Sequence, residues 1–168
     1  PYNCATVGCA FNVIRQEDIT LEIWDTAGQE RYMSMCPMYY RKANIVVLVF
    51  DVSDIATIDR MGEYIDLFFT SLTSETVDPK FVLVGNKIDK VHIDENIVKE
   101  YILVNRFVKQ YNLTKAPILF VSAINNLNID DLRKQLFSYA TIKPVIENKV
   151  ILEEPVATSS CGYIYTQC

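Results

Sequence analysis

The chain has 168 residues, of which 50% are hydrophobic, and this is enough for one domain with a sizeable core. A formal net charge of −5 argues against nucleic acid as the main partner, because phosphate backbones call for basic surfaces. The five cysteines form no C-x-x-C pair, so they fit a reduced, cytoplasmic protein better than a zinc site or a disulfide scaffold.

The first strands along the chain are predicted to form a hairpin, and the later ones a parallel sheet. Residues 11–15 and 19–24 flank a short polar turn and are expected to pair with each other. Residues 45–50, 81–84 and 118–121 (IVVLVF, FVLV and ILFV) are continuous apolar runs. Such runs are typical of strands that are covered on both faces of a parallel sheet.

Helical periodicity fills the gaps between these strands. Apolar residues recur at spacings of three and four over residues 58–72, 97–111 and 132–140. We expect each stripe to face the core. The second stripe consists of Ile97, Tyr101, Val104, Val108 and Tyr111. Because strands alternate with helices, the sequence predicts an α/β fold with a doubly wound sheet.

The pattern changes from residue 142 onward. Pro144, Pro155 and a Thr-Ser-Ser run break both periodicities there. We therefore expect a single domain over residues 1–141 and a flexible C-terminal tail over residues 142–168.

Polar clusters follow three of the predicted strands. Residues 25–29 (DTAGQ), 85–89 (GNKID) and 122–123 (SA) each come directly after an apolar run. Ligands of open α/β sheets bind beyond the carboxyl ends of the strands. The three clusters are therefore expected to meet at one edge of the sheet and to form a site there.

These clusters carry a family resemblance. The segments WDTAGQERY, GNKID and VSA, in this order and spacing, resemble the Ras superfamily of small GTPases, and TVGCAF, YYRKA and LVFDVSD are most similar to Rab proteins. The resemblance covers about residues 6–141. It implies a three-layer, P-loop NTPase-like α/β fold with a mostly parallel sheet. It also implies a GTP-binding and GTP-hydrolysing molecular switch in vesicle trafficking, peripheral on the cytosolic face of endomembranes.

The resemblance implies that two of the loops bind the base of GTP or GDP. Guanine presents two adjacent donors that the carboxylate of Asp89 can accept, whereas adenine would leave this carboxylate unpaired. Asn86 would brace the loop, and the stem of Lys87 would pack over the purine ring. The backbone N–H of Ala123, which follows Ser122, would meet the guanine O6. The alternative for Asn86 is a plain turn held by its own Asx hydrogen bond.

The loop after the second strand would serve the phosphates and Mg²⁺. In the family, Asp25 corresponds to the carboxylate that holds Mg²⁺, and Thr6 to the threonine that completes the metal shell. Gly28 would offer its N–H to the third phosphate, and Gln29 would orient the attacking water as the catalytic residue. The alternative is that Gln29 merely begins a solvated helix.

Two further features concern partners. Phe11, Trp24 and Tyr39 correspond to an exposed aromatic surface for effectors, although the same residues could simply pack in the core or hairpin. The resemblance also implies exchange-factor and activating-protein partners. Cys168 is a lipidation candidate for membrane association through prenylation, but it is not part of a clean C-a-a-X box.

The phosphate-binding loop of the family is missing from this sequence. None of the five glycines is followed by lysine, so no G-x-x-x-x-G-K-[ST] motif is present. The family places this loop and its first strand upstream of Thr6, with the strand between those that end at Trp24 and begin at Ile45. We therefore expect a fold truncated at its N-terminus, with the first strand and P-loop absent and two interior strand edges open.

Two explanations for the missing loop stay open at this point. The sequence could be a fragment, in which case the longer protein with its loop would be a GTP hydrolase. It could also be a degenerate relative that is a non-catalytic protein-interaction module and binds no nucleotide.

Overall fold

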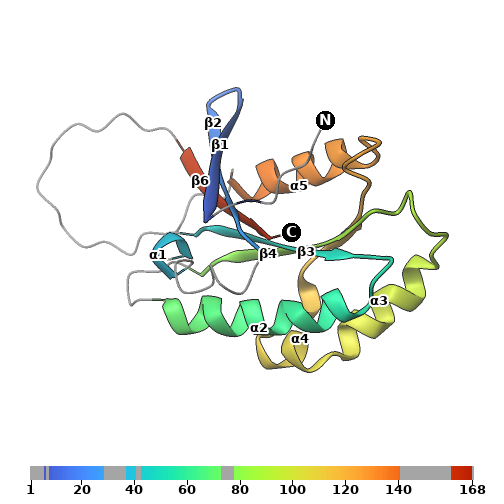
Figure 1. The fold of residues 1–168 in the computed structure, drawn as a ribbon. Helices are drawn as coiled ribbons and strands as arrows, with labels where there is room; N and C mark the ends of the chain where they lie inside the picture. The colour runs from blue at the N-terminus through green and yellow to red at the C-terminus, as the bar shows by residue number, and fades with distance from the viewer. Residues whose placement is uncertain are drawn as a thin grey trace, which may run out of the picture.

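A computed structural model gives the structure of the chain. It describes residues 6, 8–28, 37–40, 43–72, 78–140 and 160–167, and over the last of these ranges it describes the backbone only. A single sheet of six strands forms the middle layer, and helices cover both of its faces (Figure 1).

The sheet is mostly parallel, as the sequence predicts. Its strands are β1 (Cys9–Gln16), β2 (Ile19–Thr26), β3 (Ile45–Asp51), β4 (Lys80–Asn86), β5 (Ile118–Phe120) and β6 (Ser160–Gln167). Across the sheet they follow the order β1-β2-β6-β3-β4-β5. Only β1 is antiparallel to its neighbour, β2, with which it forms the expected hairpin. The α/β fold with its mostly parallel sheet is therefore confirmed.

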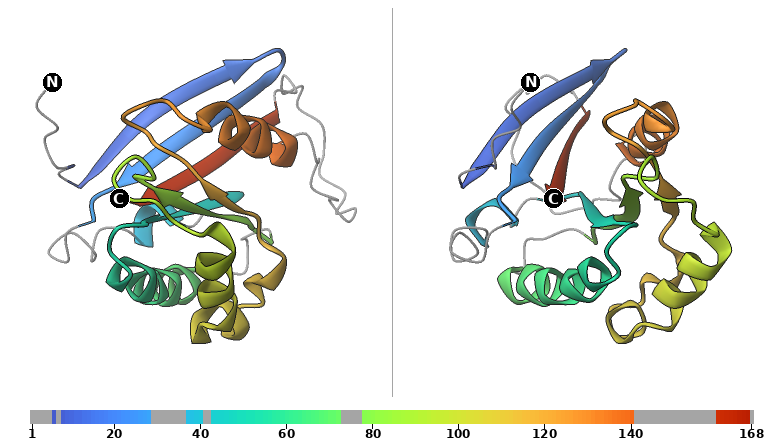
Figure 2. Two further views of the ribbon diagram at one scale, coloured as in Figure 1. Left: turned by 90° about the vertical axis from the view of Figure 1, so that its right-hand side faces the viewer. Right: turned by 45° about the vertical axis from the view of Figure 1, so that its right-hand side comes forward.

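The helices divide between the two faces of the sheet. They are α1 (Pro37–Tyr40), α2 (Ala56–Ser71), α3 (Glu95–Val104), α4 (Arg106–Gln110), the 3₁₀ helix η2 (Leu113–Lys115) and α5 (Ile129–Ala140). Figure 2 shows α2, α3 and α4 on one face and α5 on the other. A buried cluster lies on each side: one includes Phe50, Ile65 and Phe120, and the other includes Val82 and Phe137.

Helix α2 behaves as its periodicity predicts, because its apolar stripe is buried. The stripe predicted over residues 97–111 is different. Ile97 and Val104 are 65% and 64% exposed, and the buried residue of α3 is Ile102. Tyr101 is also exposed, so the expectation that this stripe faces the core is wrong for Ile97, Tyr101 and Val104. The cause is Asn105, whose extended backbone ends α3 and lets α4 begin in a new orientation that buries Val108.

Part of the tail that the sequence predicts to be flexible over residues 142–168 is a strand in the structure. Residues 160–167 form β6, which lies in parallel between β2 and β3 in the middle of the sheet (Figure 1). Ile164 is the register partner of both Ile23 and Ile45. Residues 141–159 and Cys168 lie outside the described residues.

The physical reason for β6 is the open position that β2 and β3 leave between them. Each of these strands would otherwise expose a row of unpaired N–H and C=O groups inside the sheet, which is costly. The segment SCGYIYTQ contains tyrosine, isoleucine and threonine, which favour strands. It thus occupies the position that the family resemblance gives to the first strand, and the two interior edges are paired.

Candidate functional site

The polar clusters that follow the strands lie on one edge of the sheet. Because β2, β6, β3, β4 and β5 run parallel, their carboxyl ends point the same way. Asp25 is in register with the end of β6, and Asp51 at the end of β3 is in register with Asn86 at the end of β4. The expected arrangement of the site residues along this edge follows from the sheet itself.

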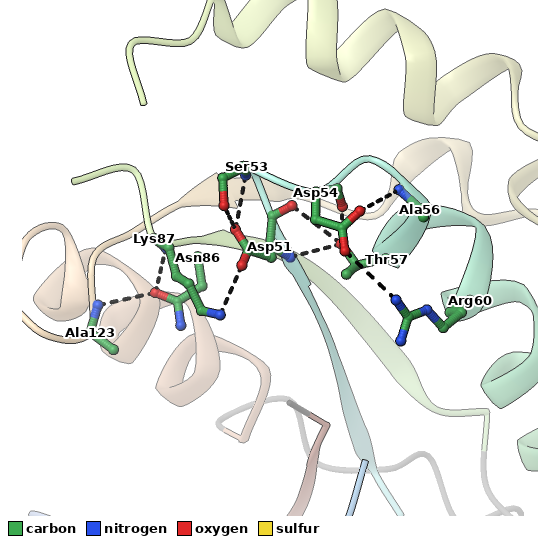
Figure 3. Close-up of polar contacts among 9 residues, drawn as sticks. All are labelled: Asp51, Ser53, Asp54, Ala56, Thr57, Arg60, Asn86, Lys87 and Ala123. Atoms are coloured by element: carbon green, nitrogen blue, oxygen red, sulfur yellow. Dashed lines mark hydrogen bonds and ion pairs between the residues drawn. The ribbon is translucent and has the colours of Figure 1, made fainter. Parts of the chain in front are cut away.

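The two loops predicted to bind the base are joined by hydrogen bonds. The side-chain oxygen of Asn86 accepts from the backbone N–H of Lys87 at 2.7 Å and from that of Ala123 at 3.1 Å (Figure 3). Buried Ser122 donates its hydroxyl to Oδ1 of Asp89. Asn86 therefore makes the Asx contact of a plain turn and also bridges to the next loop.

One oxygen of the Asp89 carboxylate accepts a hydrogen bond within the protein, and the other can accept one from a ligand. Its residue is exposed, and its Oδ1 is held by Ser122. Within the described part of the chain, no hydrogen bond to its Oδ2 is found. An oriented, exposed carboxylate oxygen is an acceptor for a ligand that carries N–H donors.

The two predicted metal ligands also lie together. The hydroxyl of Thr6 donates to Oδ2 of Asp25 at 2.9 Å. Hydroxyl and carboxylate oxygens suit Mg²⁺, which keeps several waters and takes few protein ligands, so the residues present fit this ion. Elsewhere in the described ranges, no three His, Cys, Asp or Glu side chains gather in a way that could hold a metal.

The loop after β2 is anchored on both sides. The backbone N–H of Ala27 donates to the carbonyl of Gly8 at 2.9 Å, and Gly8 adopts a φ of 76° that favours glycine. The carbonyl of Gly28 accepts a hydrogen bond of 2.8 Å from the hydroxyl of Tyr64 on α2. Gly28 is thus exposed next to the site and is tied to a helix.

Asp51 is a residue of this edge that the sequence analysis missed. Its carboxylate contacts Nζ of Lys87 at 2.8 Å and the backbone N–H of Ser53 at 2.9 Å (Figure 3). Burial alone would raise the pKa of Asp51, but the hydrogen bonds from Lys87 and Ser53 outweigh it and lower the pKa from 3.8 to about 2. Asp51 directly follows the apolar run 45–50, so the rule applied to the other strands would have found it.

The Asp51→Asn variant should reveal this pKa shift in the acid stability of the chain. The unfolded carboxyl releases its proton near pH 3.8 and the folded one near pH 2, so its stabilising contribution is complete above about pH 4 and is lost as the pH falls to about 2. The variant should be less stable than wild type in urea at about pH 5, and the difference should shrink at about pH 2.5. A difference that stays constant over this range would contradict the expectation.

A cavity of about 290 Å³ lies at this edge, between the loop after β2 and the end of β4. Its lining includes Gly28 from the loop after β2, Asp51 from β3, Asn86 from the end of β4, Lys87 from the loop after β4, and Tyr64 from α2. Of the predicted site residues, Gly28, Asn86 and Lys87 line this cavity, whereas Asp89, Ser122 and Ala123 are not part of its lining.

The three predicted effector residues form one aromatic group. The ring centroids of Phe11 and Trp24 are 4.8 Å apart, and those of Trp24 and Tyr39 are 5.4 Å apart. Phe11 is 49% exposed, whereas Trp24 and Tyr39 are half-buried and pack against the core. The group therefore combines core packing with an exposed aromatic ring.

Some predicted residues cannot be placed. Gln29 and Cys168 lie outside the described residues, and β6 is described without the side chain of Cys161. Among the helices that the structure describes, none combines the length and the hydropathy needed to cross a membrane.

Known proteins show similarity over most of the chain. A family model described as the Ras family matches residues 3–141. The ras-related protein Rab-5B of Dictyostelium discoideum is 36% identical over 138 residues, which cover 76% of this chain and 58% of that protein. The Homo sapiens ras-related protein Rab-12 is 34% identical over 132 residues, which cover 76% of this chain and 51% of that protein.

The Candida albicans ras-related protein SEC4 is 33% identical over 153 residues, which cover 88% of this chain and 68% of that protein. The chain thus spans 51% to 58% of the length of Rab-12 and Rab-5B. The family match, the parallel sheet and the joined base loops agree with one another. The chain therefore belongs to the Ras family and is a Rab-like small GTPase.

Proposed function

We propose that this chain recognises the guanine base of GTP or GDP through the loops after β4 and β5. The observation that carries this proposal is the bridge from Asn86 to the N–H of Ala123, together with the bond from Ser122 to Asp89. These contacts join the two loops and fix their relative position. A site that is already ordered loses less conformational freedom when it binds.

The geometry suggests a role for each of these residues. The carboxylate of Asp89 would accept the two donors of guanine, and adenine would leave this carboxylate without a matching donor. The N–H of Ala123, which donates to Asn86 in the structure, would be shared with the guanine O6. Lys87 would offer its aliphatic stem to the purine ring.

The remaining parts of the proposal concern the switch. Thr6 and Asp25 would hold Mg²⁺, which neutralises charge on the phosphates when it is bound. Gly28 would donate its N–H to the third phosphate, and Gln29 would orient water for GTP hydrolysis in a longer protein that supplies a phosphate-binding loop. Release of Gly28 after hydrolysis would change the surface that effectors see.

The biological setting is also a proposal. We infer a role in vesicle trafficking at the cytosolic face of endomembranes, with effectors, exchange factors and activating proteins as partners. Prenylation of Cys168 would supply membrane attachment. The Rab-like family membership of the chain supports this setting.

The Asp89→Asn variant tests base recognition. GMP and AMP differ in the base, so a titration followed by NMR measures discrimination without depending on a phosphate loop. We expect wild type to prefer GMP and the variant to lose about 10- to 100-fold of this preference, because a hydrogen bond to a charged group is worth about 1.5–3 kcal/mol. The matched control is Asp78→Asn, whose side chain is 91% exposed. A wild-type chain that binds both nucleotides equally, or neither, would refute the proposal.

The second candidate is a protein-interaction module that binds no nucleotide. The aromatic group of Phe11, Trp24 and Tyr39 favours it, because the exposed ring of Phe11 can contact a partner protein without any bound nucleotide. The titration with GMP separates the two candidates. Absence of any guanine preference, in a chain that is folded, would leave the module as the better account.

A further inference from the structure

One ion pair joins the base-recognition loop to the neighbouring strand. Lys87 lies in the loop that follows β4, and its Nζ is 2.8 Å from Oδ2 of Asp51 at the end of β3 (Figure 3). Asp51 is also in register with Asn86, the residue before Lys87. The side chain of Lys87 is therefore stretched from one strand end to the next, along the rim of the cavity that both residues line.

The backbone of Lys87 is already fixed by its own contacts. Its φ is 69°, in the left-handed region, and its N–H donates to the side chain of Asn86 at 2.7 Å. Its carbonyl accepts from the N–H of Lys90 at 2.9 Å. The side chain is 45% exposed and has four rotatable bonds, so these backbone contacts do not by themselves decide where the stem lies.

The carboxylate of Asp51 is held in an orientation that suits this ion pair. Its Oδ1 accepts from the backbone N–H of Ser53 at 2.9 Å and from the hydroxyl of the same residue. Its Oδ2 is thereby left for Lys87. The depressed pKa keeps the carboxylate ionised at neutral pH. Each oxygen of the Asp51 carboxylate therefore has its own partner.

We propose that Asp51 is a positioning residue for guanine binding, which acts by holding the stem of Lys87 in place beside the base. This inference rests on the proposed function, in which that stem packs over the purine ring. A stem that is already ordered loses less rotamer freedom on binding than a free one. Asp51 acts through Lys87 and needs no contact with the ligand.

The test is a double-mutant cycle on GMP affinity, measured by NMR titration of the 168-residue chain. Asp51→Asn removes the charge of the carboxylate but keeps an oxygen for Ser53, and Lys87→Met keeps an apolar stem but removes the ammonium. We expect each variant to weaken GMP binding about three- to tenfold. The double variant should bind no more weakly than either single variant, because both changes remove the same contact.

Two readouts separate positioning from a general structural effect. The preference for GMP over AMP should be unchanged in Asp51→Asn, because Asp89 and not Asp51 distinguishes the bases. The matched control is Asp131→Asn, which breaks the 3.0 Å ion pair with Lys134 on helix α5, outside the proposed base loops, and should leave GMP affinity at the wild-type value.

The outcomes are distinguishable. Three results would overturn the role of Asp51 but would not affect the proposed function. They are wild-type GMP affinity in both single variants, additive losses of GMP affinity in the double variant, and an equal loss of GMP affinity in Asp131→Asn. Failure of the wild-type chain to prefer GMP over AMP would refute both. If Asp51→Asn does not fold, the Lys87→Met variant is the deciding test. GMP affinity equal to wild type in Lys87→Met would overturn the proposal. A lower affinity in Lys87→Met, together with wild-type affinity in Lys87→Arg, would support it.

Discussion

The Gly85→Ala variant is expected to lose about 1–3 kcal/mol of its free energy of unfolding, and more if the surrounding rings cannot move. Gly85 is buried in β4, directly before Asn86. A Cβ atom at this position would lie 2.7 Å from Phe120, 2.8 Å from Phe50 and 2.9 Å from Val52. Both phenylalanines are themselves buried, so the strand or the aromatic rings must shift. Urea denaturation of wild type and variant measures the loss.

Gly62→Ala provides a matched control for this experiment. Gly62 lies in α2, and a Cβ atom there would lie 3.5 Å from the ring of Phe107, which is a normal packing distance. Alanine favours a helix over glycine by about 1 kcal/mol, so this variant should be as stable as wild type or more so. Equal stability of Gly85→Ala and wild type would contradict the tight packing of β4. Because Asn86 follows Gly85, the destabilised variant should also bind GMP more weakly.

The Ile164→Pro variant is expected to destabilise the whole domain by about 3 kcal/mol or more. Ile164 lies in β6 and pairs with Ile23 on one side and Ile45 on the other. In a strand with two neighbours, each backbone N–H donates to one or the other, so proline removes a hydrogen bond and its ring obstructs the ladder. Such a loss is a large fraction of the 5–15 kcal/mol that typically stabilises a domain.

The control for this variant is Ile164→Val, which leaves the backbone of β6 unchanged. Thermal unfolding and amide hydrogen exchange should show the effect. In wild type, amides of β6 should exchange as slowly as those of β3, and in Ile164→Pro the protection of β2 and β3 should fall together. Unaltered stability of the proline variant would show that β6 is not part of the sheet in solution.

The sequence was sufficient for the parts of the fold that depend on local patterns. Continuous apolar runs identified β3, β4 and β5, and the hairpin of β1 and β2 followed from two short strands around a polar turn. The prediction of a core-facing stripe over residues 97–111 was wrong because one extended residue, Asn105, changes the direction of the chain without interrupting the apolar spacing. Periodicity reports spacing along the chain and cannot detect a break in helix axis.

Strand β6 could not be predicted for a different reason. Its preference for strand structure is modest, and its place depends on two unpaired edges that are distant in the sequence. The expectation of open edges between Trp24 and Ile45 was itself derived from the family, yet nothing local links those edges to residues 160–167. Pairing of this kind is a property of the assembled sheet.

In the candidate site, too, some residues follow from local sequence patterns and others are revealed only by the folded structure. Because ligands of open α/β sheets bind beyond the carboxyl ends of the strands, the sequence alone proposes Asp25, Asn86, Asp89 and Ser122 as candidates at this edge. The same rule would have placed Asp51 at this edge, but its contacts with Ser53 and Lys87 become visible only in the folded structure. Tyr64 was missed because a helical tyrosine gives no sequence signal that its hydroxyl reaches Gly28.

The central position of β6 has a consequence for how the chain acquires its structure. Ile19 and Ser160 are register partners, so the middle of the sheet depends on contacts between residues that are very far apart in the chain. Such non-local pairing folds slowly. During synthesis, β2 and β3 emerge long before their shared neighbour, and their edges are exposed to other chains throughout that interval. The edges of β2 and β3 therefore stay unpaired until β6 has been made.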